Sequence, residues 1–128
     1  MQIRMATVMV DDQERALDFY TNVLGFVKKD DVSMGDFRWL TVSSPEGVAD
    51  AELVLERTDF PPSRAYQRAR FEAGIPAAAF ITTDIESEYA RLHSRGVQFR
   101  GAPQVMGVIK TAVFEDTCGN IINLVERL

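Results

Sequence analysis

TVMVDDQERALDFYTNVLGF (residues 7–26) decides the fold, because a related stretch, AFITTDIESEYARLHSRGVQF (residues 79–99), follows in the second half of the chain. Each stretch starts with an apolar run, passes through an aspartate into a helical pattern, and ends in a glycine shortly before a phenylalanine. Asp12 aligns with Asp84 at an offset of 72 residues. A repeat of this length that occurs only twice predicts two fused modules, as gene duplication would produce.

Local patterns assign the same order of elements to both modules. In the first module we expect a strand at 2–10, a helix that starts after Asp11 or Asp12 and ends at Gly25, and strands at 26–29 or beyond, 37–42 and 51–56. In the second we expect a strand at 79–82, a helix between a capping box at 83–86 and Gly96, and strands at 97–100, 109–114 and 121–124. Each module is therefore βαβββ, with one helix to cover one face of its sheet.

Length and composition predict a single domain with a hydrophobic core. The chain has 128 residues, about one domain, and 46% of them are hydrophobic. We expect this domain to consist of module one (1–57), a linker (58–75) and module two (76–128). The linker has room for a short helix at 64–71, and Arg64, Arg68 and Arg70 are typical of its solvated face.

Charge and residue counts exclude several kinds of partner and site. The net charge of −5, from 14 basic and 19 acidic residues, disfavours nucleic acid and anionic membranes, since both are bound mainly through Lys and Arg. No apolar run approaches a membrane span and the N-terminus has no signal-peptide pattern, so we expect a cytoplasmic protein. The single cysteine, Cys118, excludes an internal disulfide, and the single histidine, His93, excludes a multi-histidine metal site. His93 suits a structural role at a helix end, and nothing near Cys118 in sequence activates a thiol.

Four segments carry a resemblance to a known family. They are ALDFYTNVLGF (16–26), AELVL (51–55), TDIESEYARLHSRGVQF (83–99) and FEDTCGNIINLVE (114–126). Together they resemble the vicinal oxygen chelate superfamily, which includes glyoxalase I, extradiol dioxygenases, fosfomycin-resistance proteins and bleomycin-binding proteins. The resemblance implies an α+β fold in which two tandem βαβββ modules form a cupped half-barrel mixed sheet with the helices outside. Function does not follow from it, because one fold hosts many chemistries.

The same resemblance identifies four positions at which active members hold a divalent metal, usually with His, Glu, His and Glu. These positions fall on Met5, Glu52, Ala77 and Asn123. Only Glu52 is a competent anionic ligand, since a thioether is soft, alanine has no donor and an amide is a weak neutral ligand. We therefore expect no metal and no other cofactor.

Strand alternation indicates what lines the cup instead. The residues that share its face are mostly small and apolar, which is typical of a pocket for an organic molecule. Trp39 is a candidate stacking residue, and Phe37 and Tyr66 are others, although plain core packing is the competing interpretation for each. The expected ligand-binding residues are Met5, Thr7, Met9, Trp39, Glu52, Val54, Ala77, Ala79 and Asn123.

Glu52 is the cup residue best able to take part in binding or catalysis, because a carboxylate can pair with an amine or act as a general acid or base. The competing interpretation is that Glu52 is retained from an ancestral protein without a function, and that its carboxylate is hydrogen-bonded by Asn123, Thr7 or water. We expect a metal-free protein that binds or sequesters a small organic compound, and its acidic charge favours a cationic one. The alternatives are a glyoxalase-like lyase, isomerase or dioxygenase that uses a displaced metal site or Glu52, and a structural dimer with a filled cup. Exposed strand edges favour a homodimer in every case.

Overall fold

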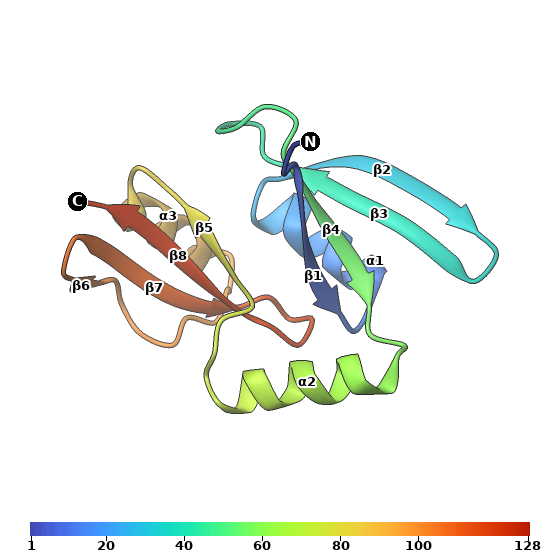
Figure 1. Cartoon of the computed structure of the whole chain (residues 1–128). Helices are drawn as coiled ribbons and strands as arrows, with labels where there is room; N and C mark the ends of the chain where they lie inside the picture. Colours follow the sequence, from blue (N-terminus) through green and yellow to red (C-terminus); the bar gives the residue numbers. More distant parts are fainter. The chain divides into compact units, whose positions relative to one another are not determined.

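The computed structural model describes residues 1–128 and divides them into two compact units, Met1–Arg64 (unit 1) and Ala65–Leu128 (unit 2). Each unit contains one four-stranded mixed sheet and a helix between its first two strands. The expected α+β class and both βαβββ modules are confirmed (Figure 1). Helix α2 (Pro61–Glu72) crosses the boundary between the units.

Unit 1 builds its sheet in the order β1-β4-β3-β2, with β1 parallel to β4 and the other neighbours antiparallel. A helical segment between β1 and β2 changes from α-helix to π-helix without a break. The elements are β1 (Met5–Val10), α1 (Gln13–Asp18), the π-helix η1 (Phe19–Val23), β2 (Val27–Met34), β3 (Phe37–Ser43) and β4 (Glu52–Arg57).

The core of unit 1 lies between the helical segment and one face of this sheet. Alternate strand residues turn to the same face, so every second residue of a strand can be buried. The buried set comprises Val8, Val10, Leu40, Val42 and Leu55 from the strands and Ala16, Phe19 and Tyr20 from the helical segment. No helix of unit 1 covers the other sheet face, which carries the expected cup residues Met5, Thr7 and Met9.

Unit 2 repeats the plan in the order β5-β8-β7-β6, with β5 parallel to β8. Its elements are β5 (Ala78–Ile81), α3 (Ile85–Ser94), β6 (Gln104–Met106), β7 (Ile109–Glu115) and β8 (Ile121–Arg127). Buried residues on α3 and on alternate strand positions form the core: Ile85, Leu92, Ala112, Phe114, Ile122 and Leu124.

Both aspartates of the repeat cap their helices as expected. The Asp12 side chain accepts from the backbone N–H of Arg15 at 2.9 Å, and Asp84 accepts from that of Ser87 at 3.0 Å. These bonds satisfy N–H groups that have no partner inside the helix. Hydrogen bonds favour the ionised carboxylates, so the pKa of each aspartate is lowered from its ordinary value, at Asp84 mainly by the Ser87 hydroxyl and then by the Ser87 N–H, and at Asp12 mainly by the Arg15 N–H.

Three expected elements differ in the structure. The strand expected at 97–100 is wrong, because that segment makes only an isolated bridge from Phe99 to Phe114, and the sheet edge is formed by β6. The first strand begins at Met5 rather than at residue 2. Helix α2 begins at Pro61, earlier than expected, because proline is well accommodated in the first turn of a helix.

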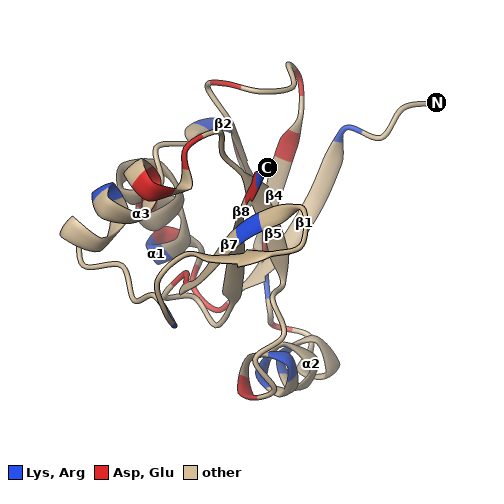
Figure 2. Cartoon of the chain, turned by 90° about the vertical axis from the view of Figure 1, so that its left-hand side faces the viewer, with Lys and Arg blue, Asp and Glu red and all other residues tan.

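Charged residues occur on helices, loops and strands alike, as the blue and red segments of Figure 2 mark, and β2 alone carries Lys28, Lys29, Asp30 and Asp31. None of the helices has both the length and the apolar character that a membrane crossing requires. Arg64 and Arg68 of α2 are exposed, as expected for a solvated helix face.

Candidate functional site

The uncovered face of the unit 1 sheet brings the expected cup residues of β1 and β4 together. The parallel ladder pairs Met5 with Glu52, Thr7 with Val54 and Met9 with Glu56. Paired residues project from the same face, so thioethers, a hydroxyl and carboxylates share one surface. Met5 is 47% exposed, whereas Val54 is buried. Thr7 is exposed like Met5, so the β1 side of this surface is accessible while Val54 on β4 is covered.

Glu52 is held by a neighbour that the sequence did not reveal. The Thr41 hydroxyl, on β3, donates to Glu52 Oε1 at 2.9 Å. The same hydroxyl oxygen accepts from the backbone N–H of Asp30 at 3.1 Å. Because the oxygen of Thr41 already receives that N–H, its own proton is directed to Glu52, and one carboxylate oxygen is fixed in place.

Strands β3 and β4 pair only briefly and then separate. Their ladder consists of Thr41 with Val54 and Val42 with Leu53. Beyond it the side chain of Gln13, from the start of α1, lies between the strands. Its Nε2 donates to the backbone oxygen of Arg38 at 3.0 Å and to that of Leu55 at 2.9 Å. A buried side-chain amide thus replaces the missing backbone bonds, and nothing in the sequence near Gln13 predicts this.

A cavity of about 220 Å³ opens at this separation. Trp39 and Phe37 from β3 and Val54 and Glu56 from β4 contribute to its wall. Trp39 is half-buried, and its indole N–H lies 3.4 Å from Asp30 Oδ2. Trp39 lies two residues before Thr41 on β3, and Glu56 lies two residues after Val54 on β4. Residues two apart on a strand share a face, so the indole and the carboxylate belong to the same sheet face as Glu52. The expected stacking role of Trp39 therefore has a cavity to act in.

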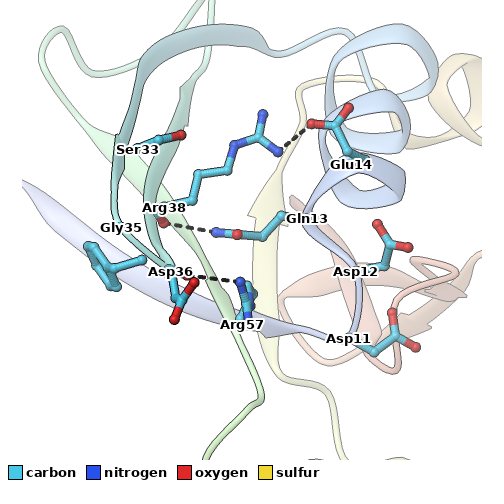
Figure 3. Close-up of a pocket in the computed structure, with 10 residues that line it drawn as sticks. Asp11, Asp12, Gln13, Glu14, Ser33, Gly35, Asp36, Arg38 and Arg57 are labelled. Atoms are coloured by element: carbon cyan, nitrogen blue, oxygen red, sulfur yellow. Dashed lines mark hydrogen bonds and ion pairs between the residues drawn. The ribbon is translucent and has the colours of Figure 1, made fainter.

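A second cavity, of about 470 Å³, adjoins the same separation. It shares five residues with the first, namely Gln13, Asp36, Phe37, Arg38 and Arg57. Figure 3 shows Gln13 reaching from the start of α1 toward β3, between Arg38 and Arg57. Acids and bases line this second cavity, and its residues are Asp11, Asp12, Gln13, Glu14, Ser33, Gly35, Asp36, Phe37, Arg38 and Arg57.

The two arginines at these cavities are already engaged. Arg38 makes a bidentate pair with Asp31, with both N–O distances 2.8 Å, and a further ion pair with Glu14. The Arg38 guanidinium lowers the pKa of Asp31, and the carboxylates in turn raise the pKa of Arg38. Arg57 donates to the backbone oxygen of Asp36 at 3.0 Å and pairs with Asp59. Their charges are therefore neutralised by the protein itself.

Unit 2 presents a matching but neutral face. Its parallel ladder pairs Ala79 with Asn123, while Ala77 precedes β5 and donates its N–H to the Ile121 oxygen at 2.8 Å. The Thr111 hydroxyl, on β7, donates to Asn123 Oδ1. Ala79 therefore lies opposite Asn123, and Ala77 lies two residues away on the same strand face.

The remaining sequence candidates lie outside these surfaces. Tyr66, on α2, is 55% exposed and carries the Arg70 guanidinium 5.5 Å from its ring centre. His93 is exposed near the end of α3, with its ring 5.6 Å from that of Tyr89. Cys118 is fully buried, and its backbone oxygen accepts from the Gln67 amide at 3.1 Å. Cys118 belongs to a packed turn, where no reactant reaches its thiol.

The side chains at the four metal positions do not fit a divalent ion. Met5 offers a thioether and Ala77 offers no donor atom, whereas such ions prefer several oxygen or imidazole ligands. One oxygen of Glu52 is occupied by Thr41, and Asn123 is bonded to Thr111. The structure contains no group of three or more His, Cys, Asp or Glu side chains that could hold a metal.

Two tandem βαβββ units, each built on a four-stranded mixed sheet, define the class of fold to which the chain belongs. The chain belongs to the Glyoxalase/Bleomycin resistance protein/Dioxygenase superfamily, whose family model matches residues 2–124. It is 46% identical over 127 residues to the uncharacterized protein YurT of Bacillus subtilis (strain 168), covering 99% of this chain and 100% of YurT.

Solved structures agree with this assignment. The crystal structure of UcmS2 superposes with a TM-score of 0.83 at 29% identity, covering 98% of this chain and 97% of UcmS2. TnmS3, an antibiotic binding protein from Streptomyces sp. CB03234, superposes with a TM-score of 0.79 at 31% identity, covering 100% of this chain and 97% of TnmS3. The fold is therefore shared over the full length of the chain.

Proposed function

We propose that this protein binds and sequesters a small organic compound on the uncovered faces of its sheets, without a metal ion. The observation that carries the proposal is the uncovered face of unit 1, where apolar side chains surround one carboxylate held by Thr41. Such a surface has the composition of a ligand site, in which a few fixed polar groups set orientation among apolar contacts.

Charge favours a cationic compound. Glu52 and Glu56 lie on the same face as Trp39, and the chain as a whole carries a net charge of −5. An acidic surface attracts cations and disfavours anions, and an aromatic ring adds attraction for a cation at its face. TnmS3 supports the general assignment by analogy, since it is described as an antibiotic binding protein.

The donor chemistry supports binding without a metal. A metalloenzyme of this fold would need several hard ligands, and the positions in question hold one carboxylate, one amide, one thioether and one alanine. We also propose that the protein acts as a homodimer, because both units leave sheet faces and strand edges uncovered.

Equilibrium dialysis tests the proposal. The full chain, treated with a chelator and desalted, is dialysed against a panel of amine-bearing antibiotics and smaller aromatic amines, with neutral analogues in parallel. We expect at least one compound to be retained at about one per chain, to be recovered unchanged, and to be retained equally after incubation with Ni²⁺, Zn²⁺, Mn²⁺ or anaerobic Fe²⁺ followed by desalting.

Glu52→Gln is the matched variant, because it removes the charge and keeps an oxygen that can accept from Thr41. Retention of a cationic compound that binds beside Glu52 should fall about tenfold, while retention of a neutral analogue stays the same. Conversion of the compound to a product, or binding only after stoichiometric metal is loaded through Glu52, would contradict the proposal and favour an enzyme. Sedimentation of the untagged chain measures whether it is a dimer.

A further inference from the structure

We propose that the separation between β3 and β4 in unit 1 is a binding site for a flat aromatic compound with a cationic nitrogen, and that Gln13 determines this specificity. The inference rests on the proposed function and names the ligand class and the residues that recognise it. It depends on three features: an oriented amide, an aromatic wall and carboxylates without partners.

The amide of Gln13 is oriented by the backbone. Only an NH₂ group can face two carbonyl oxygens, and both of its hydrogens are taken by Arg38 and Leu55. Its oxygen, Oε1, accepts no hydrogen bond from the protein, although the residue is only 6% exposed. Gln13 lines both cavities at the separation. It therefore presents a fixed acceptor to a ligand that supplies an N–H group.

The wall of the smaller cavity suits a flat apolar body. Trp39 and Phe37 offer ring faces or edges, and Val54 offers an aliphatic surface between them. Its volume of about 220 Å³ exceeds the roughly 150 Å³ that accommodates a benzene molecule. Phe37 is 51% exposed, so binding would remove apolar surface from water. One or two fused rings match this space.

The charges around the cavity favour a cation. Its two arginines are paired with acids of the protein, Arg38 with Asp31 and Arg57 with Asp59. The carboxylates of Glu56 and Asp36 have no hydrogen-bond or ion-pair partner. A ligand ammonium would therefore meet two available carboxylates and the Gln13 oxygen, whereas a ligand carboxylate would meet only repulsion.

This site has no counterpart in unit 2. The position that corresponds to Gln13 in the repeat, at the same offset of 72 residues that relates Asp12 to Asp84, is Ile85, which has no amide. Strands β7 and β8 pair without interruption, from the pair of Ile109 with Arg127 to the pair of Glu115 with Ile121, so no separation opens between them. The combination of an oriented amide and separated strands therefore occurs in only one half of the duplicated fold.

The only tryptophan of the chain provides the readout. In ¹⁵N-labelled full-length protein, the indole N–H of Trp39 gives a single signal, which is followed during titration with 2-naphthylmethylammonium. The uncharged 2-naphthylmethanol and the anionic 2-naphthoate are the matched probes. We expect the ammonium compound to shift the Trp39 and Gln13 side-chain signals and to bind about tenfold more tightly than the alcohol, with no binding of 2-naphthoate.

Two variants and one control identify the recognising groups. Glu56→Gln should weaken binding of the ammonium compound about fivefold to tenfold and leave the alcohol unchanged. Gln13→Met keeps the length of the side chain and removes both the acceptor and the donor to the Arg38 and Leu55 oxygens, so it should reduce the preference for the ammonium compound, and amide exchange in β3 and β4 reports any loosening of the strands. Glu46→Gln changes the same charge on an exposed loop of unit 1 and should have no effect.

Dialysis with the same three compounds separates this inference from the proposed function. Retention of the ammonium compound without movement of the Trp39 signal would overturn the inference and leave the proposed function standing. Equal affinity for all three compounds would overturn the cationic specificity. Failure to retain these compounds and every member of the antibiotic panel would overturn both.

Discussion

The hydroxyl of Thr41 donates a hydrogen bond of 2.9 Å to Glu52 across two neighbouring strands. Unit 2 contains the same relationship, since Thr111 donates to Asn123. Thr41 pairs with Val54 and Thr111 with Val125, so the two threonines occupy equivalent places in their sheets. Both halves of the duplication therefore keep the hydroxyl donor, while the acceptor is charged in one half and neutral in the other.

Thr41→Val tests whether this bond stabilises the fold. Valine has nearly the same shape but no hydroxyl, so Glu52 and the Asp30 N–H each lose a partner. We expect the free energy of unfolding to fall by about 1–2 kcal/mol in urea titration. Thr111→Val is the matched change in unit 2. A Thr41→Val protein as stable as the wild type would show that water replaces the hydroxyl without cost.

Gln13→Leu tests the bridge between the separated strands. The substitution leaves the backbone oxygens of Arg38 and Leu55 without their donor. We expect a loss of about 1–3 kcal/mol in the free energy of unfolding, together with faster amide exchange in β3 and β4. Unchanged exchange in these strands, with unchanged stability, would mean that the amide does not hold them.

Gly119→Ala tests the contact between helix α2 and the turn before β8. Gly119 has a φ of +93°, and an added methyl carbon would lie 2.9 Å from the amide atoms of Gln67. Gly25→Ala is the control, since Gly25 has a φ of +92° and open space around it. We expect the control to lose about 1 kcal/mol from backbone strain and Gly119→Ala to lose about 1–3 kcal/mol more. Equal losses in thermal unfolding would contradict a tight contact.

Asp84→Ala tests the cap of α3 through its pH dependence. Hydrogen bonds from Ser87 lower the pKa of Asp84 from its ordinary value of 3.8. A carboxyl with a lowered pKa in the folded state stabilises the protein above the unfolded pKa, and this contribution is lost as pH falls through the folded pKa. The stability difference between wild type and variant should therefore be largest near neutral pH and shrink in acid. A difference that is constant in urea titrations across this range would exclude the ionised cap.

The features that could be predicted from the sequence are the ones encoded locally. The N-caps at Asp12 and Asp84 depend on a few neighbouring residues, and strand alternation is visible along each strand. The βαβββ order followed from these signals and from the repeat. The strand expected at 97–100 was wrong because the segment pairs with β7 only at one bridge, Phe99 with Phe114, and strand propensity alone does not extend a bridge into a ladder.

The features that were missed depend on contacts between distant parts of the chain. Thr41 reaches Glu52 only because the β3–β4 register places them diagonally, 11 residues apart in sequence. Gln13 follows a helix cap, where a glutamine is ordinarily solvated, and its burial arises from strands 25 and 42 residues away. No local pattern distinguishes such a residue from a surface glutamine.

Strand β2 is a free edge of its sheet, and its sequence limits how copies of the chain can associate. It carries Lys28, Lys29, Asp30 and Asp31, and its register against β3 is interrupted between Lys28 and Asp31. Charges and a bulge make an edge a poor template for a further strand. Copies of this protein that meet through β2 would therefore not extend into a continuous sheet, which protects a concentrated solution from fibrous aggregation.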